Sequence, residues 1–161
     1  MLTVLISCWK FGDIKHWRKY YPTILYLSTN NLLYCFFVNG KYHLWRLEPD
    51  FLLNQTFSVL IQTFVILPCI VILFLSYLPK NFKNQIVYLI ISGSVLVGIE
   101  AIMYILGKIT YHNGWNFGWS IVFNFIWVIM LRFHYFKPIP AWIVSFISTA
   151  FFVIYFHVPL P

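Results

Sequence analysis

The residue with the clearest chemical potential in this chain is Glu100, a carboxylate set inside a long apolar run over residues 86–107. An ionisable side chain in the hydrocarbon of a membrane is costly unless it faces a partner or water. We therefore expect Glu100 to face the interior of a helix bundle. There it could accept a hydrogen bond from a ligand or act as a general acid or base.

Five other polar or aromatic positions complete a candidate site with Glu100. The order of the apolar runs places Asn30, Gln62 and Asn124 on three further spans, in the outer half of the membrane or near mid-depth. His112 and Trp115 follow in the outer connecting segment. The hypothesis is an outward-facing polar pocket for a small ligand, a lipid headgroup or an ion, with His112 and Trp115 lining its mouth. The alternative is that the amides only form hydrogen bonds between helices.

Two other classes of function stay open. An intramembrane enzyme acting on a lipid or isoprenoid would use Glu100 as general acid or base, with His112 as its partner. A structural subunit would only pack against other membrane proteins. No known catalytic motif is present, so no residue is predicted to be catalytic and the protein is interpreted as a non-enzymatic binder.

The composition indicates an integral membrane protein. Of the 161 residues, 61% are hydrophobic and only 9% are charged, whereas a soluble domain has about 25% charged residues. The net charge of +7 does not indicate nucleic-acid binding, because the cations lie between apolar runs instead of along one face. The length fits one domain over residues 1–161.

Metals and cofactors are not expected. Cys8, Cys35 and Cys69 are far apart and form no C-x-x-C motif, and no two histidines have the i, i+4 spacing of a zinc site. The cysteines are interpreted as small apolar residues.

Continuous apolar runs favour membrane-spanning helices over barrel strands, which would alternate in short segments. Residues 1–9 are also apolar but span only about 14 Å as a helix, which is too short to cross a membrane. The prediction is an all-α bundle with about five transmembrane helices and a short N-terminal helix, and Pro68 is expected to kink the second span. The five runs cover residues 23–38, 51–78, 86–107, 117–136 and 141–157.

The distribution of cations predicts an orientation. With five spans, eight of the 11 lysines and arginines lie on one side of the membrane. The positive-inside rule places that side in the cytoplasm. Residues 10–22 are therefore expected in the cytoplasm and the C-terminus outside. The eight cations are Lys10, Lys15, Arg18, Lys19, Lys80, Lys83, Arg132 and Lys137.

The outer connecting segments carry two local patterns. Asn113-Gly114 is a strong turn pair and Asn116 is suited to cap the following helix. His43 and Glu48 suggest an acid–base pair, but their spacing fits no known box, and the segment around them is interpreted as a solvated loop.

Several stretches together resemble an uncharacterised family of small multi-pass membrane proteins from spore-forming Gram-positive bacteria. The resemblance covers most of the chain and implies a protein of the cytoplasmic membrane, without implying an activity or a catalytic residue. It rests on Gly12-Asp13, Trp17-Arg18-Lys19-Tyr20-Tyr21-Pro22-Thr23, Glu48-Pro49-Asp50-Phe51-Leu52, Tyr111-His112-Asn113-Gly114-Trp115-Asn116, Leu131-Arg132-Phe133-His134 and Lys137-Pro138.

Overall fold

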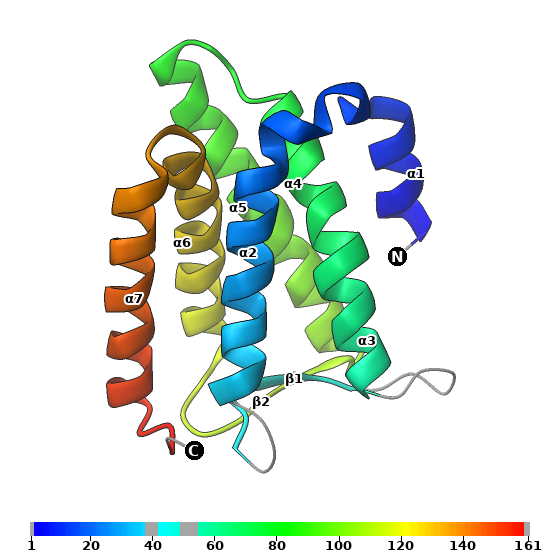
Figure 1. Ribbon diagram of the computed structural model, residues 1–161. Helices are drawn as coiled ribbons and strands as arrows, with labels where there is room; N and C mark the ends of the chain where they lie inside the picture. The colour runs from blue at the N-terminus through cyan, green and yellow to red at the C-terminus, as the bar shows by residue number, and fades with distance from the viewer. Residues whose placement is uncertain (1, 38–41, 49–54, 160–161) are drawn as a thin grey trace.

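The computed structural model describes residues 2–37, 42–48 and 55–159, and it confirms the all-α bundle (Figure 1). Long helices run up and down between two ends of the molecule, and a short strand pair crosses one end. The helical elements are α1 (Leu2–Phe11), η1 (Ile14–His16), α2 (Trp17–Phe37), α3 (Gln55–Ile61), η2 (Gln62–Ile66), α4 (Leu67–Ser76), α5 (Phe82–Ile105), α6 (Phe117–Phe136) and α7 (Pro138–Tyr155).

Within the described residues, four helical segments are long and apolar enough to cross a membrane: Phe57–Ser76, Phe82–Ile105, Phe117–Phe136 and Pro138–Tyr155. The remaining predicted span forms as α2, which is 21 residues long and extends along the bundle in Figure 1. It is more polar than the others because it begins with Arg18 and Lys19 and carries Asn30 and Asn31. It packs against α4 and α6.

The second span bends through a wider turn directly before Pro68. Residues Gln62–Ile66 form a π-helical segment between α3 and α4. Proline lacks a backbone N–H, and its ring clashes with the carbonyl one turn earlier, so a wider turn relieves both problems. The expected irregularity at Pro68 is therefore present and lies in the turn that precedes it.

Polar side chains on α2 meet this π-helical segment. Ser28 donates a hydrogen bond to the Thr63 carbonyl oxygen at 3.1 Å, and the Asn31 amide donates to Thr63 Oγ1 at 2.7 Å. The Thr63 hydroxyl, fully buried, donates in turn to the Val59 carbonyl at 2.7 Å. These bonds join α2 to the second span where its backbone is irregular.

The helices do not all have the same surroundings. The centre of the bundle is formed by α2, α4 and α6, and α7 and α5 pack against α6 on the outside. Along α5 most large apolar side chains are exposed, which suits a helix with one face on acyl chains. The short α1 packs mainly against α4, beside the end where α2 begins.

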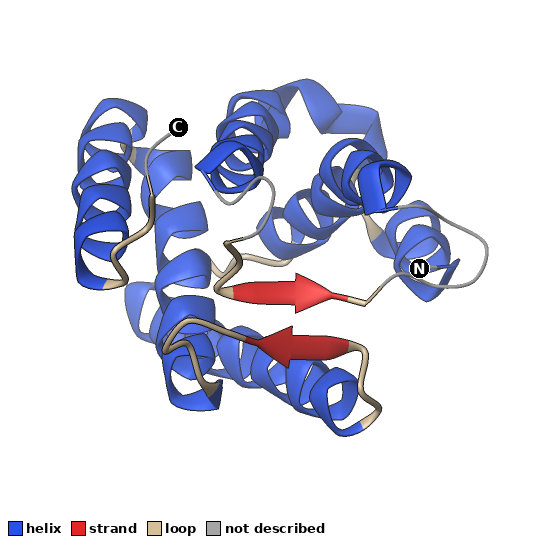
Figure 2. Ribbon diagram, turned by 90° about the horizontal axis from the view of Figure 1, so that it is seen from below, coloured by secondary structure: helices blue, strands red, loops and turns tan. Residues whose placement is uncertain are grey.

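Two connecting segments pair as a short β-ribbon, which the sequence did not predict. Strand β1 (Trp45–Leu47) is antiparallel to β2 (Ile109–Tyr111), with Trp45 opposite Tyr111. Figure 2 shows the two strands side by side across this end of the bundle. Glu48 extends the pairing through its N–H to the Lys108 carbonyl at 3.0 Å. His43 and Glu48 therefore flank a strand and form no acid–base pair with each other.

The turn after β2 has the predicted chemistry. Asn113 and Gly114 both have positive φ, 53° and 84°, which asparagine and glycine tolerate best. The Asn116 side chain accepts a hydrogen bond from the Trp119 N–H at 3.1 Å and so caps α6.

The two ends of the bundle differ in charge. The eight lysines and arginines from Lys10 to Lys137 that were named above lie at or near helix ends, at the end of the bundle opposite the ribbon. Arg46 and Lys108 lie at the end with the ribbon. We call the end with the eight cations the cationic end and the end with β1 and β2 the ribbon end.

Candidate functional site

Glu100 faces the protein at the junction of α5, α6 and the ribbon. Its side chain is half-buried. One carboxylate oxygen accepts a hydrogen bond from the Tyr111 hydroxyl at 2.9 Å, and the other accepts from the Asn124 amide at 2.5 Å. The expectation that Glu100 and Asn124 come together across two helices therefore agrees with the geometry.

Most hydrogen-bonding groups of the cluster formed by Glu100, Tyr111 and Asn124 already have partners. The Asn124 amide nitrogen also donates to the Ser120 carbonyl at 2.9 Å, which satisfies its second N–H. The ring of Tyr111 stacks on Tyr104 of α5, with centroids 5.0 Å apart. Burial raises the pKa of Tyr111 to about 12. The hydrogen bond with Ser120 lowers this pKa and Glu100 raises it further, so the phenol keeps its proton and acts as a donor. The cluster ties α5 to α6 and to β2.

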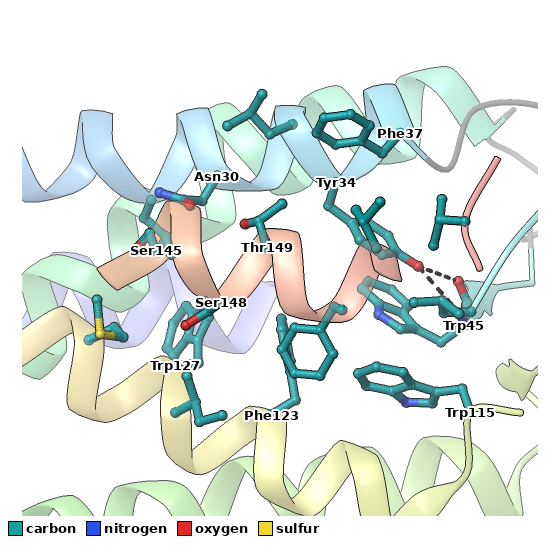
Figure 3. Close-up of a pocket in the computed structure, with 18 of the residues that line it drawn as sticks. Asn30, Tyr34, Phe37, Trp45, Trp115, Phe123, Trp127, Ser145, Ser148 and Thr149 are labelled. Atoms are coloured by element: carbon teal, nitrogen blue, oxygen red, sulfur yellow. Dashed lines mark hydrogen bonds between the residues drawn. The ribbon is translucent and has the colours of Figure 1, made fainter. Parts of the chain in front are cut away.

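A cavity of about 150 Å³ lies elsewhere, between α2, α6 and α7 at the ribbon end (Figure 3). Its walls come from residues 26–37 of α2, 123–130 of α6 and 145–153 of α7. The ribbon side adds Leu44, Trp45, Trp115 and Val158. None of the described residues that line the cavity is an acid, a lysine, an arginine or a histidine.

Aromatic side chains form the ribbon-side wall of the cavity. The rings of Tyr34 and Trp45 stack almost parallel, with centroids 4.8 Å apart and an angle of 7°. The Tyr34 hydroxyl donates to the Trp45 carbonyl at 3.0 Å. Trp115 is buried against Phe152 and Phe156, and its indole N–H donates to Ser120 Oγ at 2.8 Å. This wall is apolar and its polar atoms are paired.

Small polar side chains gather at the opposite end of the cavity (Figure 3). Ser145 is bonded to the Tyr26 hydroxyl, and the Asn30 amide nitrogen donates to the Tyr26 carbonyl at 2.8 Å. The hydroxyls of Ser148 and Thr149 and the side-chain oxygen of Asn30 have no hydrogen-bond partner within the described ranges. The three residues are half-buried, and their oxygens are not among the buried unpaired atoms of the described residues, so they stay available to hydrogen-bond water or a bound molecule.

The six predicted site residues separate into different places. Asn30 and Trp115 line the cavity, whereas Glu100 and Asn124 belong to the cluster described above. His112 is exposed on the ribbon, where its Nε2 meets Thr110 Oγ1 at 3.0 Å. Gln62 is half-buried in the π-helical segment and does not line the cavity. The predicted single pocket around all six is not what the geometry gives.

Sequence reasoning missed the serine and threonine residues of α7 as site residues. Ser145, Ser148 and Thr149 have spacings of three and four, which place hydroxyls on one face of a helix. That stripe is the signal that could have found them.

A buried histidine adjoins the cavity at its polar end. His134 of α6 is 3% exposed. Its Nδ1 meets Thr23 Oγ1 at 3.1 Å, and its ring stacks on Tyr26 with centroids 4.1 Å apart. The histidine thus supports a cavity-lining side chain without reaching the cavity itself.

No metal-binding group of three or more His, Cys, Asp or Glu side chains occurs in the described part of the chain. No protein-family model, curated protein or solved structure matches the chain. The resemblance to a family from spore-forming bacteria therefore stays a prediction.

Proposed function

We propose that this chain is a multi-pass membrane protein that binds a small, uncharged, mainly apolar molecule in the cavity between α2, α6 and α7. The observation that carries the proposal is the composition of the cavity wall. It has an aromatic ribbon-side wall, and unpaired oxygens of Asn30, Ser148 and Thr149 at the opposite end. Apolar walls with a few convergent polar groups are typical of ligand sites.

The size and charge of the cavity narrow the class of ligand. A space of about 150 Å³ is filled by a molecule near the size of one aromatic ring, since an engineered cavity of that volume binds benzene. A charged group would lose its hydration without meeting an opposite charge on the walls. A neutral ring or short chain with one hydroxyl or carbonyl group fits best.

The orientation of the protein is part of the proposal. The cationic end faces the cytoplasm, because lysines and arginines flank the cytoplasmic ends of membrane helices. The ribbon and the C-terminus then lie outside, and the cavity sits in the outer half of the membrane. A ligand would reach it from the outer leaflet or from the outer aqueous phase.

The geometry gives less support to the intramembrane-enzyme hypothesis. That hypothesis needs Glu100 and His112 to act on the same group. Glu100 instead contacts Tyr111 and Asn124, and His112 contacts Thr110. Neither side chain lines the cavity.

The test uses three fluorinated probes of similar shape and the purified protein in lipid nanodiscs, followed by ¹⁹F NMR. We expect saturable binding of 4-fluorophenol, which is neutral and has a hydroxyl group. We expect 4-fluorotoluene, which lacks that hydroxyl, to bind about fivefold more weakly through the loss of one hydrogen bond. Charged 4-fluorobenzoate should not bind.

Two matched variants locate the binding. Ser148→Leu fills the cavity and should abolish saturable binding of 4-fluorophenol. Ser94→Leu adds the same side chain on the exposed surface of α5 and should leave binding unchanged. Equal binding by both variants, or no saturation in the unmodified protein, would contradict the proposal.

A further inference from the structure

Glu100 and the cavity are connected by an unbroken series of contacts, although Glu100 does not line the cavity. Its carboxylate accepts the Tyr111 hydroxyl at 2.9 Å. Tyr111 is the ladder partner of Trp45 in the ribbon. Trp45 in turn stacks on Tyr34 and forms part of the ribbon-side wall.

The alternation of the ribbon explains why this connection is possible. Side chains two apart on a strand point to the same face, and directly opposed residues share a face. Trp45 and Tyr111 are therefore on the face toward the bundle, where Trp45 reaches the cavity and Tyr111 reaches α5. Ile109, on the same face two residues before Tyr111, is 7% exposed.

The ribbon is attached to the bundle on two sides. Toward α2 and α7, the Tyr34 hydroxyl donates to the Trp45 carbonyl, and the Tyr42 hydroxyl donates to the Phe156 carbonyl. Toward α5, the hydrogen bond comes from Tyr111 to Glu100. No residue of α5 lines the cavity among those described, so α5 is connected to the cavity indirectly, through α6 and through the ribbon.

The geometry points to Glu100 as a positioning residue that holds the ribbon, through Tyr111, so that Trp45 closes the ribbon-side wall of the ligand cavity. This inference concerns control of access to the cavity and rests on the proposed function. It assigns the carboxylate a role other than direct contact with a ligand. It also explains why a residue that is costly in a membrane lies beside a ribbon rather than in the cavity.

The experiment measures access to the cavity without any ligand. Ser148→Cys places a thiol on the cavity wall in a background where Cys8, Cys35 and Cys69 are replaced by alanine. The rate of its alkylation by neutral N-ethylmaleimide then reports how often the cavity opens. Ser94→Cys, exposed on α5, reports the reactivity of the reagent in the bilayer.

Tyr111→Phe is the decisive variant because it keeps the ring that stacks on Tyr104 and removes the hydroxyl that donates to Glu100. We expect it to raise the alkylation rate of the Ser148→Cys thiol about fivefold, the order expected for one lost hydrogen bond. Glu100→Ala should raise the rate at least as much, and Glu100→Gln less, because the glutamine oxygen can still accept from Tyr111. Combining Tyr111→Phe with Glu100→Ala should add nothing to Glu100→Ala alone.

Asn124→Ala separates positioning of the ribbon from packing of the helices. It removes the other partner of Glu100 and leaves the Tyr111 bond in place, so the alkylation rate should stay within about twofold of the parent. A parental rate in Tyr111→Phe overturns the inference even if Glu100→Ala does not fold. So does equal acceleration by Asn124→Ala. Failure of 4-fluorophenol to bind would instead count against the proposed ligand, since alkylation needs none.

Discussion

The cluster around Glu100 and the polar end of the cavity lie in the same membrane protein but treat their polar groups in opposite ways. Glu100 is the type of side chain that is costly in a membrane without a partner, and each of its carboxylate oxygens has one, Tyr111 and Asn124. The half-buried Ser148 and Thr149 carry neutral hydroxyls, which have no hydrogen-bond partner among the described residues. The difference indicates that the ionisable Glu100 contributes hydrogen bonds that hold the bundle together, whereas the neutral hydroxyls of Ser148 and Thr149 remain available to a ligand.

The largest effect should come from removing the carboxylate of Glu100. Glu100→Ala leaves the Tyr111 hydroxyl and an Asn124 N–H without their acceptor. We expect it to lower the free energy of unfolding by about 2 kcal/mol, because two hydrogen bonds of about 1 kcal/mol each are lost. Ser148→Ala breaks no bond and should change stability by less than about 0.5 kcal/mol. Unfolding by sodium dodecyl sulfate in mixed micelles measures both, and similar losses in the two variants would remove the contrast.

An intermediate effect is expected at the π-helical segment, where polar groups are also fully paired. Thr63→Val removes the acceptor of the Asn31 amide while keeping the shape of the side chain. We expect the free energy of unfolding to fall by about 1 kcal/mol. This is above the average of about 0.6 kcal/mol for hydrogen bonds between membrane helices, because Thr63 is fully buried.

Thr29→Val is the matched control for Thr63→Val. The Thr29 hydroxyl bonds only to the Leu25 carbonyl of its own helix, so its loss should be smaller by the same unfolding measurement. A larger loss at Thr29 than at Thr63 would show that pairing between helices is not what stabilises the second span.

The smallest effect concerns a paired carboxylate in water. Asp13, between α1 and α2, meets His16 Nδ1 at 2.8 Å and accepts from Tyr20 at 3.2 Å. The hydrogen bond to His16 is the main cause that lowers the pKa of Asp13 below its usual value. Because the pKa of Asp13 is lower in the folded state, its carboxylate stabilises the fold at pH values above the unfolded pKa of about 4. This stabilisation is lost as the pH falls below that value.

Asp13→Asn tests the sign of this dependence. The variant should be slightly less stable than the parent at neutral pH, and the two should converge under acid conditions, as followed by thermal unfolding. Screening by water makes the effect small compared with Glu100. A difference that grows on acidification would contradict the assignment.

The local features of the fold could be predicted from the sequence. Continuous apolar runs fixed the helices, the turn pair Asn113-Gly114 adopts positive φ, and Asn116 caps α6. The irregular turn before Pro68 follows from the chemistry of proline alone. Each of these depends on residues within one or two turns of one another, so no knowledge of the packing was needed.

The candidate site was only partly accessible from sequence. Depth in the membrane follows from position along a span, and it put Glu100 and Asn124 in the same candidate site, where the structure joins them by a hydrogen bond. Rotation about each helix axis does not follow from position. It places Asn30 on the cavity and Gln62 away from it. The ribbon was missed for a related reason, since its strands are short and come from connections distant in the chain.

The sequence by itself determined an all-helical, membrane-type chain with its cations gathered at one end, because hydropathy and charge act residue by residue. Only the tertiary structure decided that Glu100 binds the ribbon and that Ser148 and Thr149 face an aromatic cavity. Those outcomes depend on which faces of α2, α5, α6 and α7 meet. Packing sets these faces through many weak contacts that no single segment encodes.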